Sequence, residues 1–456
     1  MTIKDKKISK LISLGFLISS ILLLIYTYYR SEISHQGHHN SHYVKYYILS
    51  TSGILFWSLV ITLKEHVRIK ILLVFSSILI GVYMIEIGIS FLTKPTITKA
   101  ESAKIEGKPF DSRSRSEFIR SLGEKGIEAV PNFAPSKFAR INYQLGKKSI
   151  CPLGGISKTS TVGNNESGEY MTIKSDRYGF NNDDNIWDAK KISWMLVGDS
   201  FAFGQAVERG QDISSRINTL TNESSLTLGN NENGPLAELG TIIEYGSTYK
   251  PTKLIWLYYE GNDLIEDLKI EKEIPTFMNY LDSKFSQNLI NRQSEIDHEL
   301  KRFIEEKRSQ LSIGKKQSNR KFLQRTEFIR LGNIRRLFQR KFEAHKVEID
   351  PIFSKILSRA KEQTKSWEGK FYFVYLPDFF RYSSKGVNHE TLFKRREVIE
   401  LVESLNIPVI DIHELVFAKE LEPLSLFPWK KTYAHYNPLG YEKIAKSIIK
   451  SVGRIN

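Results

Sequence analysis

The pattern of hydrophobic and polar positions divides the chain into an apolar first part and a mixed remainder. Three long apolar runs follow one another before the pattern changes: Leu11–Tyr29, Tyr47–Leu63 and Ile71–Thr93. Each is long enough, or nearly so, to cross a hydrocarbon core of about 30 Å as a helix. A cleaved signal peptide is the alternative for the first run, but that run is long for this purpose and two more follow it. We therefore predict a membrane anchor of three transmembrane helices over 1–94.

The positive charges of the short loops are unevenly distributed. Those before the first run and between the second and third are Lys4, Lys6, Lys7, Lys10, Lys64, Arg68 and Lys70. The loop between the first and second runs has only Arg30 and Lys45. Cytoplasmic loops carry an excess of Lys and Arg. The pattern thus predicts a multi-pass membrane protein whose N-terminus is cytoplasmic and whose chain after Lys94 is periplasmic or extracellular.

A single acid, Glu86, interrupts the third apolar run. A carboxylate within a membrane either marks a proton or substrate site or reaches a polar partner near the boundary. One acid by itself makes no proton relay, so we favour the polar partner.

From residue 95 onward, short strand-like runs alternate with helical stretches. The runs are Ile192–Val197, Ser225–Leu228, Lys253–Tyr259, Lys370–Leu376 and Ile407–Ile412. Most are continuously apolar, as expected for strands of a parallel sheet that is buried on both faces. The spacing leaves room for helical crossovers, which predicts an α/β domain over 190–456 with helices on both faces. Residues 95–189 are expected to form a linker and leading segment.

Three polar motifs stand where the carboxyl ends of these strands are expected, which is where such sheets carry their functional groups. Ser200 follows the first strand in Gly-Asp-Ser, and a serine at a strand-to-helix turn offers a nucleophile together with a free backbone N–H. The alternative interpretation is that Ser200 serves only as the N-cap of the helix. Asn262 follows the third strand in a Gly-Asn-Asp sequence that could equally be a turn. His435 precedes the last predicted helix, Glu442–Ser451, and could act as a general base to Ser200.

The order GDS, GND and HxNxxG resembles the SGNH/GDSL hydrolase superfamily. The motifs cover roughly 190–456, and the stretch Pro152–Asn182, with its SDRYGFNN sequence, resembles the segment before GDS in membrane-linked bacterial members. The resemblance implies a three-layer α/β/α fold. It also implies that Ser200 is the nucleophile and an oxyanion donor, Asn262 a second oxyanion donor, and His435 the base.

The sequence departs from the family pattern at the acid that orients the histidine. Family members usually carry an aspartate three residues before the histidine, where this chain has Thr432. Either His435 works in a dyad, or another acid such as Asp411, after the last strand, takes the role. Asp411 could equally be a structural residue at a strand end.

A second departure concerns the glycine whose backbone N–H is the family's further oxyanion donor. Alignment backward from Gly234 places Glu232 where that glycine is expected. A backbone donor does not strictly require glycine, although close approach of a substrate favours one. Gly229 and Gly234 are the remaining candidates.

The net charge is +15, from 66 Lys and Arg against 51 Asp and Glu. Within 301–341 there are 14 Lys and Arg against three acids, so most of the excess lies in an insertion over about 264–369 that reads as amphipathic helices. A solvated helical face is one interpretation, and contact with anionic lipid or glycan at the membrane is another. Nucleic acid is disfavoured, since no nucleic-acid module is present. The one cysteine, Cys151, excludes an intramolecular disulfide.

These features predict a membrane-anchored serine esterase that acts on an extracytoplasmic ester, a class of reaction that needs no cofactor or metal. The same acyl-enzyme could instead pass its acyl group to a sugar hydroxyl, as an O-acyltransferase of envelope polysaccharide. A third hypothesis is a membrane-tethered glycan- or lipid-binding module without turnover, suggested by Thr432 and the missing glycine.

Overall fold

The computed structural model describes residues 3–34, 40–92, 97–146, 150–313, 331–335, 348–384 and 388–455. The chain divides into two compact units. The membrane unit comprises Met1–Lys94 together with Gln317–Gln339, and the second unit comprises Pro95–Lys316 together with Arg340–Asn456.

Long apolar helices make up the membrane unit. They are α1 (Ile3–Tyr28), which a π-helical turn extends over Tyr29–Ser34, α2 (Asn40–Thr62) and α3 (Glu65–Leu92). Within them, Lys7–Ser34, Tyr43–Thr62 and Glu65–Phe91 are long and apolar enough to cross a membrane. The predicted three membrane-compatible helices are thereby confirmed.

Glu86 of α3 is buried and has polar partners within the same unit. Its carboxylate accepts the backbone N–H groups of Asn333 and Ile334, at 2.8 and 2.9 Å. A buried carboxylate in an apolar span is costly unless it is paired, and two N–H donors provide the pairing. The partners come from the basic insertion, where nine of the 14 Lys and Arg residues of 301–341 lie outside the described residues.

The second unit is built on a five-stranded sheet. Its strands are β4 (Trp194–Gly198), β5 (Ser225–Thr227), β6 (Lys253–Tyr259), β7 (Lys370–Leu376) and β8 (Val409–Asp411). They lie in the order β5-β4-β6-β7-β8, and every pair is parallel. The expected parallel sheet is confirmed, and the order reverses at β4, so that β4 and β6 flank the switch point at which open α/β sheets bind ligands.

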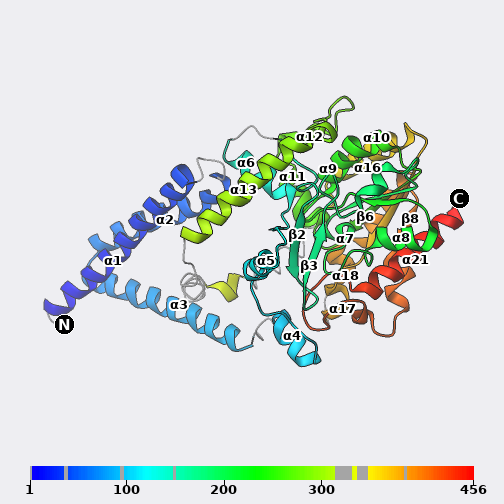
Figure 1. Cartoon of the computed structure of the whole chain (residues 1–456). Coiled ribbons are helices and arrows are strands. Elements are labelled where there is room, and N and C mark those ends of the chain that lie inside the picture. The colour runs from blue at the N-terminus through cyan, green and yellow to red at the C-terminus, as the bar shows by residue number, and fades with distance from the viewer. Residues whose placement is uncertain are drawn as a thin grey trace. The chain divides into compact units, whose positions relative to one another are not determined.

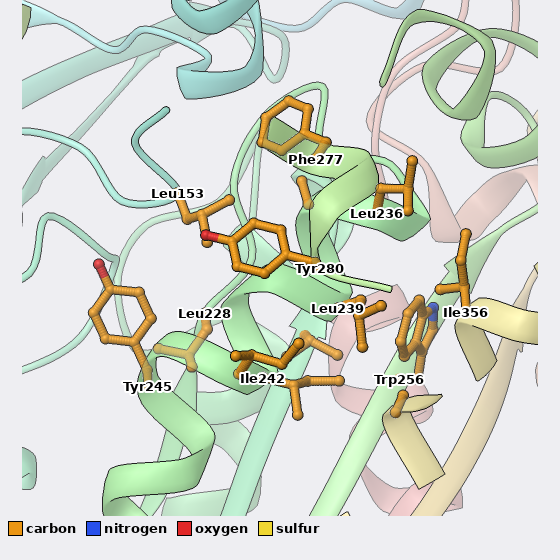
Figure 2. Packing of buried hydrophobic residues seen from close by; sticks show 14 of the residues in the cluster. Leu153, Leu228, Leu236, Leu239, Ile242, Tyr245, Trp256, Phe277, Tyr280 and Ile356 are labelled. Atoms are coloured by element: carbon orange, nitrogen blue, oxygen red, sulfur yellow. The ribbon is translucent and has the colours of Figure 1, made fainter. Parts of the chain in front are cut away.

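Alternate residues of each strand enter two separate cores, one on each face of the sheet. On β6, Trp256 and Tyr258 belong to one core, and Leu257 and Tyr259 belong to the other. Figure 2 shows Trp256 packed in the first core with Leu239 and Ile356. Period-two alternation between two apolar environments makes each strand continuously hydrophobic, which is why the sequence pattern identified these strands.

Helices cover both faces and complete three layers (Figure 1). The first core takes residues from α9 (Pro235–Thr241), α13 (Gln293–Ile313), α16 (Ile352–Lys365) and α19 (Arg395–Ser404). The second core takes residues from α7 (Ser200–Phe203), α8 (Ile213–Thr221), α20 (Ile412–Leu415) and α21 (Pro438–Ile455). The predicted three-layer α/β/α architecture is therefore confirmed.

The segment before the sheet has regular structure of its own. It contains α4 (Lys99–Glu106), α5 (Arg115–Gly123), α6 (Pro135–Gln144), β1 (Ala129–Pro131), β2 (Ser160–Asn165) and β3 (Tyr170–Lys174). The strands form a small mixed sheet in the order β1-β2-β3. This segment belongs to the same compact unit as the five-stranded sheet.

In the described part of 264–369, every regular element is helical, as the sequence indicated. Besides α13 and α16 these include α11 (Leu268–Glu271) and α12 (Pro275–Asn279).

Candidate active site

The turn after β4 positions Ser200 at the carboxyl edge of the sheet. β4 ends at Gly198, and Ser200 begins α7. Asp199 caps this short helix, because its Oδ1 accepts the backbone N–H of Phe201 at 2.8 Å. The Ser200 N–H, one residue earlier, has no acceptor among the described residues. The turn therefore presents both a hydroxyl and a free N–H donor.

His435 lies directly beside Ser200, with 2.7 Å between its Nε2 atom and the Ser200 Oγ atom. The histidine is 7% exposed, and the ring of Phe201 packs against its imidazole. Asn437 holds the loop in place, since its amide donates to the carbonyl of Ser425 at 2.8 Å and its Oδ1 accepts the Gly440 N–H at 2.9 Å. The HxNxxG sequence thus fixes the histidine just ahead of α21.

The other nitrogen of the imidazole contacts Glu166, which lies between β2 and β3. His435 Nδ1 is 2.7 Å from Glu166 Oε2, and the His435 backbone N–H donates to the same oxygen at 3.2 Å. An ionised carboxylate can only accept, so Nδ1 must carry the proton and Nε2 is left to accept the proton of Ser200. The arrangement is a Ser-His-Glu triad in geometry.

The electrostatics of this site keep Glu166 ionised. Burial by itself raises the pKa of Glu166, but the charge and hydrogen bonds of His435 and the charge of Lys99 outweigh it and lower the pKa to about 2. Lys99 Nζ is 3.2 Å from Glu166 Oε1, the oxygen that His435 does not use. The carboxylate is therefore negative over the whole range in which histidine normally titrates.

Asp411, the acid that the sequence offered for this role, has other partners in the structure and does not contact the imidazole. Asp411 accepts from Arg395, with Nη2 at 2.6 Å and Nε at 3.0 Å, and it caps α20 through the His413 N–H. β8 lies three strand spacings from β4, or roughly 14 Å at about 4.8 Å each, which places Asp411 beyond reach of a histidine paired with Ser200. Asp411 is thus the structural strand-end residue that the sequence left open, and the contact to the imidazole comes from Glu166.

Sequence reasoning missed Glu166 because it lies 269 residues from His435 and outside the three recognised motifs. The SDRYGFNN stretch was the available signal that the leading segment supports the site. In the structure Asn181 donates to the carbonyl of Phe203, at the end of α7, at 2.8 Å. Asn182 exchanges two hydrogen bonds of 2.8 Å with the backbone of Thr227 on β5. The motif therefore fastens the leading segment to the nucleophile helix and to the sheet.

The expected oxyanion donor Asn262 lies at the carboxyl end of β6. Its amide nitrogen donates to Asp267 Oδ2 at 2.6 Å. It also forms a hydrogen bond with Asp199; burial raises the pKa of Asp199, and this hydrogen bond partly opposes that rise. The donor group thus already has acidic neighbours, and its role toward an oxyanion stays a prediction.

Both candidate glycines have backbone N–H groups that already donate. The Gly229 N–H donates to Thr227 Oγ1 at 3.3 Å, and the Gly234 N–H donates to Glu271 at 2.7 Å. Glu232, by contrast, has a φ of 59°, in the left-handed region that favours glycine, and its N–H has no acceptor among the described residues. The backbone therefore adopts a glycine-like conformation at the position where the family pattern expects that residue.

Several buried carboxyls lie beneath the site. Burial and neighbouring carboxyls raise the pKa of Glu238 and Asp263 well above its ordinary value, and raise that of Asp267 to about 9. A raised pKa favours the uncharged acid in all three groups, and the value for Asp267 keeps that carboxyl protonated at pH 7. In the part of the chain that the structure describes, no three His, Cys, Asp or Glu residues are placed to hold a metal ion.

Comparisons with known proteins add only distant similarities. No protein-family model matches the chain, and no curated protein matches it in sequence. Among solved structures, a lipolytic protein of the G-D-S-L family from Desulfitobacterium hafniense DCB-2 is 13% identical, with a TM-score of 0.31 over 57% of this chain and 99% of that one. TesA is 7% identical, with a TM-score of 0.31 over 58% of this chain and 99% of its own.

These similarities are too low to bear on activity, so the fold is established by the chain's own strand order and motif positions. Its sheet is parallel throughout, and Ser200 of GDS, Asn262 of GND and His435 of HxNxxG all stand at the carboxyl edge. The chain has the three-layer fold and the motif order of an SGNH/GDSL-type protein.

Proposed function

We propose that this protein is a membrane-anchored serine esterase that hydrolyses an acyl ester. The observation that carries the proposal is the continuous hydrogen-bonded chain Ser200–His435–Glu166, with 2.7 Å at each link. A nucleophile, a base in the correct tautomer and a buried anion behind it are the elements that acyl transfer to serine requires.

In this mechanism, the Ser200 oxygen attacks the ester carbonyl while His435 Nε2 takes the hydroxyl proton. Glu166, 2.7 Å from Nδ1, stabilises the imidazolium that forms. His435 then returns the proton to the departing alcohol, which leaves an acyl group on Ser200. Water, deprotonated by His435, attacks the acyl-enzyme and releases the carboxylic acid.

The negative charge on the carbonyl oxygen needs preorganised donors. The Ser200 N–H and the Glu232 N–H are backbone donors without an acceptor among the described residues. Asn262 would be the third donor, if substrate draws one of its N–H groups away from its acidic neighbours. Removal of one such donor typically costs about 10²–10³ in kcat.

The positive charges of the short loops support a periplasmic or extracellular position for this domain, with the N-terminus in the cytoplasm. The ester substrate would then be an acylated glycan or lipid of the cell envelope. The basic insertion would contact anionic lipid or glycan, since its Lys and Arg excess belongs to a domain tethered at a membrane. Cysteines placed on either side of each span, probed with an impermeant maleimide, test the orientation.

Serine reactivity tests the proposal directly. A fluorophosphonate probe should label the full-length protein in detergent, and Ser200→Ala should abolish the labelling. Equal labelling of both forms would refute a serine mechanism at this position.

The acceptor of the acyl group decides between hydrolysis and O-acyl transfer. An acyl donor with a radiolabelled acyl group should yield free acid in proportion to turnover if water is the acceptor. Transfer of the label to envelope polysaccharide without matching release of acid would instead identify an O-acyltransferase. A non-catalytic binding module predicts neither product, and ester hydrolysis that disappears in His435→Ala would exclude it.

A further inference from the structure

Helix α4 is the first element of the second unit, and it begins shortly after the membrane unit ends at Lys94. Its start is sharply defined by a capping box. The Thr98 hydroxyl accepts the Glu101 N–H at 3.2 Å, and the Glu101 carboxylate accepts the Thr98 N–H at 2.8 Å. Reciprocal capping of this kind fixes the first helical turn, and the first residue of that turn is Lys99.

The body and end of α4 pack against the loop that leads to His435. Ala103 forms a small buried cluster with Trp429 and Ala434, the residue just before the histidine. The Glu106 carboxylate accepts the Lys430 N–H at 2.9 Å. Just past the helix, Lys108 donates to the carbonyl of Pro428 at 2.8 Å. Helix α4 therefore holds in place the loop that leads to His435.

The first residue of the helix reaches the triad acid itself. Lys99 Nζ is 3.2 Å from Glu166 Oε1, and the side chains of Lys99 and Glu166 are 27% and 8% exposed. Because His435 uses only Oε2, the lysine occupies the second oxygen and fixes the rotation of the carboxylate. An ion pair with one buried partner is screened less by water than an ion pair between two exposed side chains, so it is worth more.

On this basis, and resting on the proposed esterase function, we propose that Lys99 is a positioning residue for the Glu166–His435 pair, so that turnover depends on the helix that directly follows the membrane anchor. Lys99 does not contact the reacting atoms. It acts by holding the carboxylate in the orientation that the imidazole needs.

Other charged or titratable groups face the Glu166–His435 pair and affect how the esterase activity depends on pH. Tyr433 and Tyr441 interact electrostatically with Glu166, and burial raises the pKa of both phenols well above its ordinary value, so they stay neutral. Asp199 faces His435 from the start of α7. Among the described residues, Lys99 is the cation whose side chain contacts this pair, so its removal should let the pair hold a proton more tightly.

The test compares Lys99→Met, Lys99→Arg and Lys104→Met in the full-length protein in detergent, with Ser200-dependent hydrolysis of a short p-nitrophenyl ester as the assay. Lys104 lies on the same helix, is exposed, and has no side-chain partner among the described residues. We expect Lys99→Met to lower kcat about tenfold with little change in KM, and to move the acid limb of the pH–rate profile to higher pH. Lys99→Arg should restore both, and Lys104→Met should match the wild type.

A kcat within twofold of wild type and an unmoved acid limb in Lys99→Met would overturn the inference. A lower kcat that Lys99→Arg does not rescue, accompanied by a lower melting temperature and an unchanged pH profile, would also overturn it, because the lysine would then serve only folding. Absence of any Ser200-dependent turnover in the wild type would refute the proposed function and this inference together. Turnover that is insensitive to Lys99 refutes this inference alone.

Discussion

Replacement of Glu166 by Gln tests the triad most directly, because the new side chain has nearly the same shape but no charge. Glu166 is 6% exposed, and its carboxylate lies 2.7 Å from His435 Nδ1. Its pKa of about 2, against an ordinary value of 4.5, corresponds to roughly 3 kcal/mol of interaction in favour of the ionised form at about 1.4 kcal/mol for each pKa unit. Burial opposes the ionised form, and the charge of His435 is the largest effect that favours it, ahead of the charge of Lys99; the His435 cation is the one that forms in the transition state.

Loss of this interaction should lower kcat by about two powers of ten, since each 1.4 kcal/mol is worth a factor of ten. A glutamine amide can also donate to Nδ1, which would place the imidazole proton on Nε2 and block acceptance of the Ser200 proton. In the Ser-His-Asp template, the corresponding change costs about 10⁴ in kcat. We therefore expect a decrease in kcat of about 10²–10⁴ for Glu166→Gln, with KM changed less than about threefold because the side chain does not contact substrate.

The assay is hydrolysis of a short p-nitrophenyl ester by the full-length protein, together with the rate of fluorophosphonate labelling at Ser200. Asp411→Asn is the matched control, as it removes a carboxylate from the position that the sequence suggested and that the structure pairs with Arg395. A folded Glu166→Gln protein with kcat within about fivefold of the wild type would refute the assignment of Glu166 as the acid.

Three further outcomes follow from the contacts described above. Asp411→Asn should lower the free energy of unfolding in urea by about 1–3 kcal/mol, because it weakens the ion pair with Arg395 and the cap of α20, and an unchanged stability would contradict that role. Gly229→Ala should destabilise the protein by about 1–3 kcal/mol and lower the fluorophosphonate labelling of Ser200, since a Cβ atom there would lie 2.4 Å from the Ala202 Cβ of α7. A melting temperature and a labelling rate equal to those of the wild type would show that α7 can shift to accommodate the methyl group. Asp267 has a pKa raised to about 9, so it keeps its proton in the folded chain but loses it near pH 4 in the unfolded chain, and its contribution to stability declines as pH rises from 4 to 9. Asp267→Asn should therefore flatten the fall in melting temperature over that range. An equal slope in both proteins would argue against a buried neutral acid.

The sequence by itself determined the features that depend on local pattern. Burial of every residue of a membrane span or of a central strand leaves a continuous apolar run, so the spans in α1–α3 and the strands β4, β6 and β7 could be located from hydropathy alone. The strand ends then indicated where Ser200 and Asn262 stand, because turn chemistry is encoded by neighbouring residues. His435 could be assigned only through the order of the motifs.

Only the tertiary structure decided which acid contacts the histidine, which backbone conformation Glu232 adopts and which N–H groups donate to the Glu86 carboxylate. Each depends on groups that meet in space with no fixed separation along the chain: Glu166 is 269 residues from His435, and Glu86 is more than 240 residues from the N–H groups it accepts. A carboxylate placed by a hairpin of a separate small sheet carries no local sequence signal, because its neighbours in the chain determine only the strands on either side. Its role arises when the leading segment packs against the sheet and removes the carboxylate from water, so that a histidine and a lysine become its counter-charges.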